Sequence, residues 1–240
     1  MLQHAGIYGK GLPERTVCLT YDDGPGETVG SSPGPRTSEL GRYLHDEGIR
    51  ATFFVIGRHV EQYPASVERL HHQGHLVGNH TYSHPGLVRF VLEGGDAGWE
   101  LRKTQELIAP YVNGGPVYFR PPYGNWREKS DLRGPEDAAH SVVAAALNGD
   151  DAFANYVGPV LWDIVAEDWE CWRNDLPPDE CAQRYLAEAE RVGRGIVLMH
   201  DSSAEDDLRP KNRTLELSQR LVPMLKQRGF RFAALDDFVK

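Results

Sequence analysis

The sequence predicts a single α/β domain built as a parallel barrel. Three observations lead to this prediction. Seven short apolar runs recur along the 240 residues, helical periodicity fills most of the segments between them, and most of the runs end in polar residues. Alternating strands and helices are typical of parallel βαβ units, and seven strands in one chain suggest a barrel. A chain of this length with 40% hydrophobic residues can bury one large core.

The predicted elements follow one another in a regular order. The strands are the apolar or alternating runs Thr16–Tyr21, Ala51–Ile56, Leu76–Asn79, Val117–Arg120, Val160–Ile164, Ile196–His200 and Phe230–Leu235. The helices between them are Thr37–Asp46, Ala65–His72, Trp99–Tyr111, Pro178–Val192 and Thr214–Gln227. Gly48, Gly74 and Gly229 each follow a helical segment closely, as C-terminal caps do.

Two stretches depart from the alternation. Gly24–Pro35 is rich in Gly, Ser and Pro, and Gly124–Pro159 is a mixed polar segment with one predicted helix around Glu136–Leu147. Long loops in a compact domain are usually functional or mobile. We therefore expect residues 24–35 and 124–159 to be functional or mobile.

The composition argues against two classes of partner. The formal net charge is −9, so a broad basic surface for nucleic acid is not expected. No run approaches the roughly 20 apolar residues that span a bilayer, so we expect no membrane span. The first residues lack the pattern of a secretory signal, but an earlier segment could have been removed, so the location and the oligomeric state stay open.

The three cysteines form no CxxC pair of the kind that binds zinc or acts as a redox dithiol. Cys18 lies in an apolar run and is expected in the core. Cys171 and Cys181 flank a Pro-rich turn. They either form a disulfide or remain two free thiols, and the sequence leaves both possibilities open.

Chemistry-bearing residues are expected at the carboxyl ends of the strands, where parallel α/β folds build their sites. Asp22 and Asp23 are adjacent, so their side chains converge only if the chain turns, and the following Gly24-Pro25 favours that turn. Taken alone, the pair is more typical of a solvated turn.

His80 and His84 are four residues apart. On a helical turn this spacing places both imidazoles on one face, where they can bind one metal ion. Two surface histidines are the ordinary alternative. Together with a carboxylate from another strand end, the two histidines complete a metal site with open positions for water and substrate.

Two further strand ends carry single charged or titratable residues. Arg120 precedes Pro121-Pro122, which lack backbone donors and stiffen the segment. An arginine held in this way can orient a carboxylate or bind a charged substrate, whereas a structural salt bridge is the ordinary alternative. His200 ends an apolar run, and its position at the same rim favours a catalytic role over a buried structural one.

With these motifs in this order, the chain resembles the polysaccharide deacetylase family, which has the NodB-homology domain and is also called carbohydrate esterase family four. The resemblance extends from about Thr16 to Phe238. It implies a distorted (β/α)7 barrel with one divalent metal ion, zinc or cobalt, at its top. It also implies a hydrolase that removes N-acetyl or O-acetyl groups from N-acetylglucosamine-type glycans such as chitin oligomers or peptidoglycan.

The resemblance implies roles for the residues at the strand ends. Asp23, His80 and His84 would bind the metal, Asp22 would be the general base, and Arg120 would orient that base.

The same resemblance implies an acid and a substrate pocket. His200 would be the general acid, with Asp168 as its tuning partner, and the backbone N–H of Tyr123 would help to hold the oxyanion. The residues implied to contact substrate are Pro121, Trp169 and Leu198, the last two as walls of the acetyl pocket.

The chain departs from the family pattern in two places. The family often has a further aspartate three residues after Trp162, where this chain has Val165, so Asp168 would act without that neighbour. The loops at residues 24–35 and 124–159 are longer than a minimal member needs. Both follow catalytic strands, so we expect them to shape the substrate groove and affect the choice of glycan.

Two other functions are compatible with the fold. One is a metal-free hydrolase of cyclic amides or ureides, and such relatives tend to lose parts of the metal triad. The other is a catalytically silent glycan-binding module, and degenerate members usually lose the base or the acid. The residues expected in those roles, Asp22, Asp23, His80, His84 and His200, are all present, which favours the deacetylase.

Overall fold

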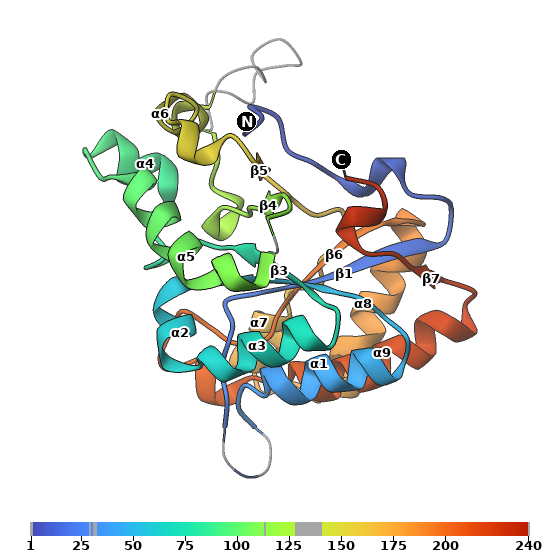
Figure 1. Cartoon of the computed structure of the whole chain (residues 1–240). Helices are drawn as coiled ribbons and strands as arrows, with labels where there is room; N and C mark the ends of the chain where they lie inside the picture. Colours follow the sequence, from blue (N-terminus) through green and yellow to red (C-terminus); the bar gives the residue numbers. More distant parts are fainter. Residues whose placement is uncertain (1, 29, 31–32, 113, 128–140, 240) are drawn as a thin grey trace.

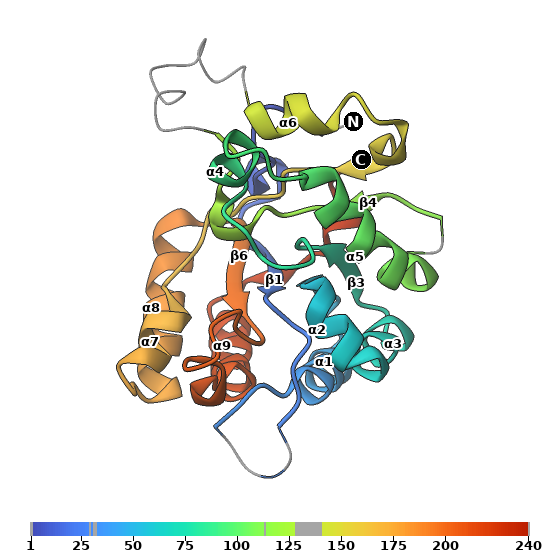
Figure 2. The same ribbon diagram turned by 90° about the vertical axis from the view of Figure 1, so that its left-hand side faces the viewer.

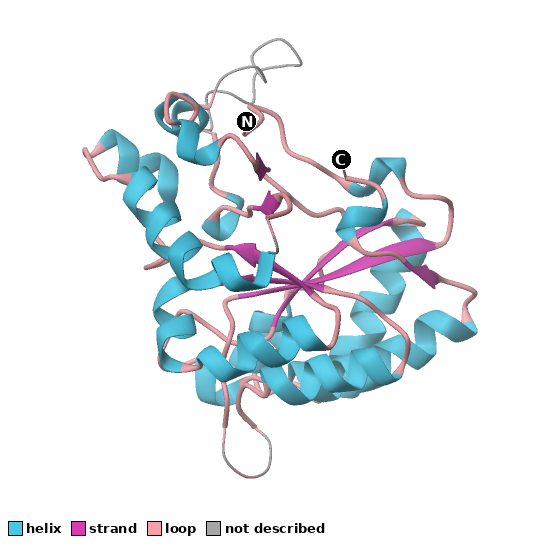
Figure 3. Ribbon diagram, in the orientation of Figure 1, coloured by secondary structure: helices cyan, strands magenta, loops and turns pink. Residues whose placement is uncertain are grey.

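Parallel strands cross at the centre of the molecule, and helices surround them (Figure 1 and Figure 3). This computed structural model describes residues 2–28, 30, 33–112, 114–127 and 141–239. The strands are β1 (Thr16–Asp22), β2 (Thr52–Val55), β3 (Leu76–Asn79), β4 (Val117–Tyr118), β5 (Tyr156–Val157), β6 (Gly195–His200) and β7 (Arg231–Phe232). The α-helices are α1 (Thr37–Asp46), α2 (Gly57–Gln62), α3 (Pro64–His72), α4 (Leu87–Leu92), α5 (Ala97–Val112), α6 (Val142–Leu147), α7 (Asp168–Arg173), α8 (Pro178–Val192) and α9 (Thr214–Gln227). Short 3-10 helices include η1 (Gly9–Gly11), η2 (Pro122–Gly124), η5 (Asp151–Phe153), η6 (Arg209–Lys211) and η7 (Leu235–Asp237).

β1 is the central strand. The sheet order is β3-β2-β1-β6, β7 also pairs with the first residues of β1, and all of these pairs are parallel. β4 pairs with β5, and single parallel bridges join Phe119 to Asn79 and Ile164 to Val197. The strand pairing therefore continues from β3 to β4 and β5, and the segment after β5 returns to β6 through a single bridge at Ile164. This arrangement confirms the predicted distorted (β/α)7 barrel.

Burial explains why these segments form the centre. Every residue of β1 and of β2 is buried, as expected for parallel strands that are covered on both faces. In Figure 1, α1, α3 and α9 lie side by side along one side of the strands, and Figure 2 shows α7 and α8 beside α9. Two apolar clusters form the core. A large one extends from Leu2 to Phe230, and a smaller one includes Cys18, Phe54 and Ile196.

The predicted elements agree closely with the structure, with one wrong strand. α1, α8, α9 and β3 have the predicted bounds, and α3 and α5 differ by one or two residues. The strand predicted at Val160–Ile164 is wrong, since only single bridges occur at its two ends. The Asp163 carboxylate accepts hydrogen bonds from the Ile196 amide at 2.9 Å and the Gly9 amide at 2.7 Å. The Ile196 amide of β6 is therefore not available to pair with the backbone of a neighbouring strand at this position. β5 forms earlier, directly before Gly158.

The second long loop contains regular structure. α6 is the C-terminal part of the helix predicted around Glu136–Leu147, and residues 136–140 lie outside the described residues. α6 packs against α4 and α5, and the Phe153 and Tyr156 rings meet edge to face at 5.2 Å. None of the described residues of 24–35 and 124–159 lines the main cavity, so their effect on substrate choice stays a prediction.

The cysteines and the helices settle two further points. Cys171 and Cys181 form a disulfide that joins α7 to α8, with their Cα atoms 6.1 Å apart. Cys18 is a buried free thiol, and burial raises its pKa. In the described part of the chain, no helix is both long enough and apolar enough to cross a bilayer.

Candidate active site

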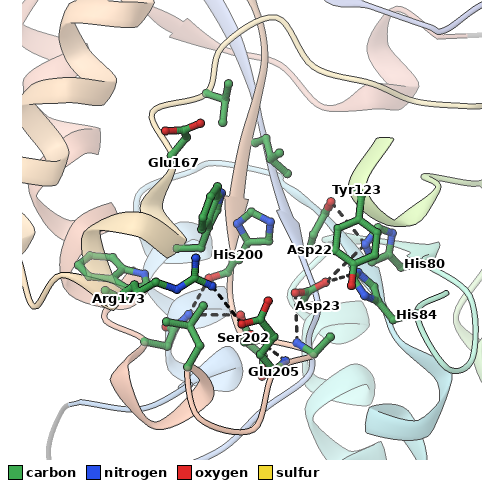
Figure 4. A pocket seen from close by; sticks show the side chains of 18 of the residues that line it. Asp22, Asp23, His80, His84, Tyr123, Glu167, Arg173, His200, Ser202 and Glu205 are labelled. Atoms are coloured by element: carbon green, nitrogen blue, oxygen red, sulfur yellow. Dashed lines mark hydrogen bonds and ion pairs between the residues drawn. The ribbon is translucent and has the colours of Figure 1, made fainter. Parts of the chain in front are cut away.

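The polar strand ends meet around one cavity of about 470 Å³. Figure 4 shows the two sides of this cavity. Asp22, Asp23, His80 and His84 lie on one side, and His200 lies on the other. β1 ends at Asp22 and Asp23 follows it, the segment after β3 carries His80 and His84, and β6 ends at His200. The cavity therefore gathers residues that are far apart in the sequence, as the strand-end prediction expected.

The chain turns sharply after β1, as the Asp-Asp-Gly-Pro sequence predicts. Asp22 is the last residue of the strand, and Asp23 has a left-handed backbone with φ of 72°. At Gly24, a Cβ atom would lie 2.1 Å from a carboxylate oxygen of Asp201, so any side chain there would have to displace Asp201. This turn lets two adjacent carboxylates face the same cavity.

The prediction that His80 and His84 lie on a helical turn is wrong. They lie in an irregular loop in which Thr81 and His84 have positive φ values of 68° and 67°. The Asn79 side chain accepts a hydrogen bond from the Thr81 amide at 2.9 Å, and the Thr81 hydroxyl accepts one from the His84 amide at 3.1 Å. These local bonds replace helical ones. The two imidazoles still come together, with ring centroids 5.0 Å apart.

A buried carboxylate holds this loop, and the sequence analysis missed it. Glu100 on α5 accepts hydrogen bonds from the Tyr82 amide at 2.8 Å, the Ser83 amide at 2.7 Å and the Ser83 hydroxyl at 2.6 Å. Glu100 is almost completely buried. Since buried carboxylates are stable only when their oxygens are paired, Glu100 and the loop fix each other. No local pattern marks Glu100, because its partners belong to another element.

Three acceptor groups converge at the rim. One ligand atom from each of Asp23, His80 and His84 can be chosen so that all lie within 4.8 Å of one another. Asp23 Oδ1 lies 3.1 Å from His84 Nε2 and 3.5 Å from His80 Nε2. His80 Nδ1 lies 2.7 Å from the carbonyl oxygen of Arg120 and must donate to it, so in the neutral ring Nε2 carries a lone pair toward the carboxylate. Such a set of lone pairs fits a cation, as the sequence predicts.

Arg120 holds the other aspartate. Its guanidinium is fully buried, and Nη1 donates to Asp22 Oδ1 at 2.7 Å and to the Thr20 hydroxyl at 2.8 Å. Nε donates to the Val160 carbonyl at 2.9 Å, and the guanidinium carbon lies 4.3 Å from the centre of the Phe54 ring. With so many contacts Arg120 cannot reorient. It therefore fixes Oδ1 of Asp22 while Oδ2 lies 3.7 Å from His80 Nε2.

Asp168 and His200 form a second charged pair. His200 Nδ1 lies 2.8 Å from Asp168 Oδ1, and the His200 amide donates to Oδ2 at 2.7 Å. Tyr185 and Thr214 also donate to this fully buried carboxylate, at 3.3 and 3.5 Å. Burial acts to lower the pKa of His200, but the charge and hydrogen bond of Asp168, and then Asp23 and Asp22, raise it to about 10. His200 therefore carries a proton at neutral pH.

The walls of the cavity are partly apolar. Trp169 and Leu198 line it as the resemblance implied, together with Val165. Tyr123 has a positive φ of 60°, and its ring meets that of His84 edge to face at 4.6 Å. Pro121 is buried and is not among the described residues that line the cavity, so its contact with substrate stays a prediction.

Asp201 is a further acidic residue that the sequence analysis did not single out. Its carboxylate is buried beside Gly24, and burial raises its pKa to about 7. The Thr37 hydroxyl donates to Asp201 Oδ2 at 2.5 Å, and the Asp201 amide donates to the Asp22 carbonyl at 3.1 Å. In the sequence, only the position of Asp201 directly after His200 indicates that it lies near the site. Asp201 therefore packs against the Asp22–Gly24 turn and stabilises it.

Comparison with known proteins gives a consistent result. The family model of the polysaccharide deacetylases matches residues 9–135. A chitooligosaccharide deacetylase from Rhizobium leguminosarum bv. trifolii is 30% identical over 231 residues, which cover 94% of this chain and 92% of that protein. A peptidoglycan-N-acetylglucosamine deacetylase from Bacillus cereus is 26% identical over 219 residues, or 91% of this chain and 66% of that protein. The structure of the chitin deacetylase from the fungal pathogen Colletotrichum lindemuthianum matches with a TM-score of 0.65 at 25% identity and covers 100% of this chain and 90% of that chain.

Proposed function

Because this chain belongs to the polysaccharide deacetylase family, we propose that it hydrolyses N-acetyl groups of N-acetylglucosamine-type glycans such as chitin oligomers or peptidoglycan. One observation carries the proposal. A convergent Asp-His-His set lies beside the Asp22–Arg120 pair and shares one cavity with the His200–Asp168 pair. A base, an acid and a cation site around one cavity are what amide hydrolysis requires.

The donor set supports one divalent metal. Two imidazole nitrogens and one carboxylate oxygen, from His80, His84 and Asp23, suit zinc in a catalytic site that keeps open positions, and cobalt is the alternative. When bound, the metal acts as a Lewis acid that eases deprotonation of water and stabilises negative charge on a carbonyl oxygen. Burial acts to raise the pKa of Asp23, but the nearby histidines hold it well below its ordinary value, so the carboxylate is ionised and able to bind a cation.

The proton transfers are assigned to the two charged pairs. Asp22, held by Arg120, takes the proton of the attacking water through the carboxylate oxygen that Arg120 leaves free. His200 uses Nδ1 to bind Asp168, so Nε2 remains to give a proton to the leaving nitrogen. The backbone N–H of Tyr123 is proposed to stabilise the oxyanion. Trp169 and Leu198 are proposed to hold the acetyl methyl group, since both line the cavity.

The same residues count against the two alternatives. A metal-free hydrolase of cyclic amides or ureides would have no use for three convergent metal-ligand groups, and here Asp23, His80 and His84 are all buried at the cavity. A silent glycan-binding module would have no use for a charged His200–Asp168 pair opposite Asp22.

The experiment that tests the proposal is acetate release. The purified chain is freed of metal by chelation and assayed on N-acetylglucosamine oligomers, peptidoglycan, poly-N-acetylglucosamine and acetylated xylan, before and after Zn²⁺ or Co²⁺ is restored. We expect release from the N-acetylated polymers that depends on the added metal. Full activity after exhaustive chelation would favour the metal-free reaction, and binding of oligomers without acetate release would favour the silent module.

A further inference from the structure

A buried histidine lies directly behind the proposed metal ligand Asp23. His59 on α2 is almost completely buried, and its Nδ1 lies 2.8 Å from the backbone carbonyl oxygen of Asp23. Its Nε2 lies 3.2 Å from Nη2 of Arg209. A guanidinium only donates, so Nε2 must accept, and Nδ1 must carry the proton that is donated to Asp23. Burial lowers the pKa of His59 to about 4, which agrees with a neutral ring at pH 7.

Arg209 connects this histidine to the other side of Asp23. Its Nε donates to the Ser203 carbonyl at 2.9 Å, and the next amide, that of Ala204, donates to Asp23 Oδ2 at 3.2 Å. The hydrogen bonds therefore form a closed circuit from the Asp23 carbonyl through His59, Arg209 and the 203–204 peptide back to the Asp23 carboxylate. In Figure 4, Asp23 lies between the His80–His84 pair and the segment that carries Ser202 and Glu205.

This circuit has a geometrical consequence for the metal site. Asp23 has a φ of 72°, a conformation that costs free energy unless its surroundings hold it. With Oδ2 held by the Ala204 amide, Oδ1 is the oxygen that faces His84 at 3.1 Å and His80 at 3.5 Å. The circuit thus fixes both the backbone of Asp23 and the choice of carboxylate oxygen.

We propose that His59 and Arg209 are positioning residues that hold Asp23 with Oδ1 directed into the metal site. Neither residue is among the described residues that line the cavity, so each acts through Asp23 and not on the substrate. This inference rests on the proposed role of Asp23 as a metal ligand. Hydrogen-bonding partners of metal ligands typically change metal affinity by about 10- to 100-fold when they are removed.

The test measures metal binding by the metal-free full chain. Co²⁺ is titrated into the wild type and the variants His59→Leu, His59→Gln and Arg209→Met, with the affinity taken from competition with a chelator and the geometry from the visible absorption of Co²⁺. His59→Leu and Arg209→Met should each weaken binding by roughly 10- to 100-fold. Glutamine has one amide donor and one carbonyl acceptor, so His59→Gln should recover most of the affinity. The double variant His59→Leu/Arg209→Met should bind Co²⁺ no more weakly than the more weakly binding of the two single variants, because both residues belong to one circuit.

Two substitutions serve as matched controls. His75 is also buried and neutral, since burial lowers its pKa to about 4, and its two ring nitrogens contact the Ala51 amide at 3.2 Å and the Gly41 carbonyl at 2.8 Å. It lies before β3, at the opposite end of that strand from His80. His75→Leu should lower stability but leave Co²⁺ affinity unchanged. Arg184→Met removes an arginine that pairs with Glu180 on the exposed face of α8, and it controls for the loss of one charge.

The possible results separate the two proposals. A wild type that binds no Co²⁺ and keeps full activity after exhaustive chelation contradicts the proposed function itself. If the wild type binds Co²⁺ and His59→Leu and Arg209→Met bind it equally well, the positioning role is overturned. It is also overturned if His59→Gln is no better than His59→Leu, since hydrogen bonding would then not be the cause. Should His59→Leu fail to fold, Arg209→Met and His59→Gln still decide the question.

Discussion

The Asp168 carboxylate contacts His200 through both of its oxygens, one at Nδ1 at 2.8 Å and the other at the backbone amide at 2.7 Å. The aspartate therefore fixes the orientation of the ring as well as its charge. The geometry leaves Nε2 as the atom available to the cavity. It also makes the protonation of His200 depend on one neighbouring charge.

The first prediction concerns pH dependence. An ordinary histidine has a pKa of about 6.5, whereas that of His200 is raised to about 10, against the effect of burial, by Asp168 and the cavity aspartates. The upper limb of the pH–rate profile should report the loss of this proton. A cation bound at Asp23 repels the imidazolium, so the limb of the metal-loaded enzyme should lie below pH 10. Asp168→Asn removes the charge that raises the pKa of His200, while His200 stays buried, so the upper limb should move to lower pH. An unchanged limb would show that another group is the acid.

The second prediction separates substrates by their leaving groups. His200→Ala should slow release of acetate from a chitin oligomer by about 10²- to 10⁴-fold, because the amide nitrogen needs a proton to leave. An activated acetate ester needs no such proton and should be affected much less. The measurement is kcat/KM for both substrates with wild type and variant. Equal losses on both would indicate that His200 serves binding or structure.

The third prediction distinguishes the adjacent aspartates. Asp22→Asn should abolish acetate release while the metal stays bound, because Asp22 is paired with Arg120 and assigned as the base. Asp23→Asn should lose both, since Asp23 Oδ1 faces the two histidines. Metal content by elemental analysis and acetate release are measured on both variants. Equal metal loss in the two would mean that the neighbours have been assigned the wrong roles.

The fourth prediction concerns the loop that carries the proposed histidine ligands. Glu100→Ala removes the buried acceptor of three hydrogen bonds from Tyr82 and Ser83. An unpaired donor costs about 1–3 kcal/mol when it is buried, but Tyr82 is half-buried and Ser83 is exposed, so water can replace part of the lost bonding. We therefore expect the free energy of unfolding to fall by about 1–2 kcal/mol. Metal affinity should fall as well, because His80 and His84 flank those donors. Thermal unfolding of the metal-free proteins and a Co²⁺ titration check both effects. Wild-type metal affinity in a destabilised variant would restrict Glu100 to a structural role.

Much of the fold could be predicted from local sequence patterns. Helical periodicity and caps are properties of adjacent residues, and α1, α8 and α9 have the bounds that these patterns predict. The candidate site could also be predicted, because the carboxyl ends of parallel strands meet at one rim. For this reason Asp22 and His200, which pair in register between β1 and β6, were expected near each other.

Other features depended on contacts between distant segments. His80 and His84, the proposed metal ligands, lie in a loop and not on a helical turn. Side chains of Asn79, Thr81 and the distant Glu100 accept from the amides that a helix would use. The strand expected at Val160–Ile164 is interrupted because the Asp163 carboxylate accepts a hydrogen bond from the Ile196 amide of β6. The bonds from Glu100 and from Asp163 are not visible in a local pattern, since each needs a partner from another element.

The sequence by itself determined the alternation of strands and helices, the family resemblance and the set of chemical groups at the strand ends, because all three follow from the type and spacing of residues along the chain. The tertiary structure alone decided the disulfide between Cys171 and Cys181 and the circuit in which His59 and Arg209, 150 residues apart, hold Asp23. The physical reason is that hydrogen bonds and disulfides require atoms within a few ångströms of one another. Only the folded barrel brings these atoms that close.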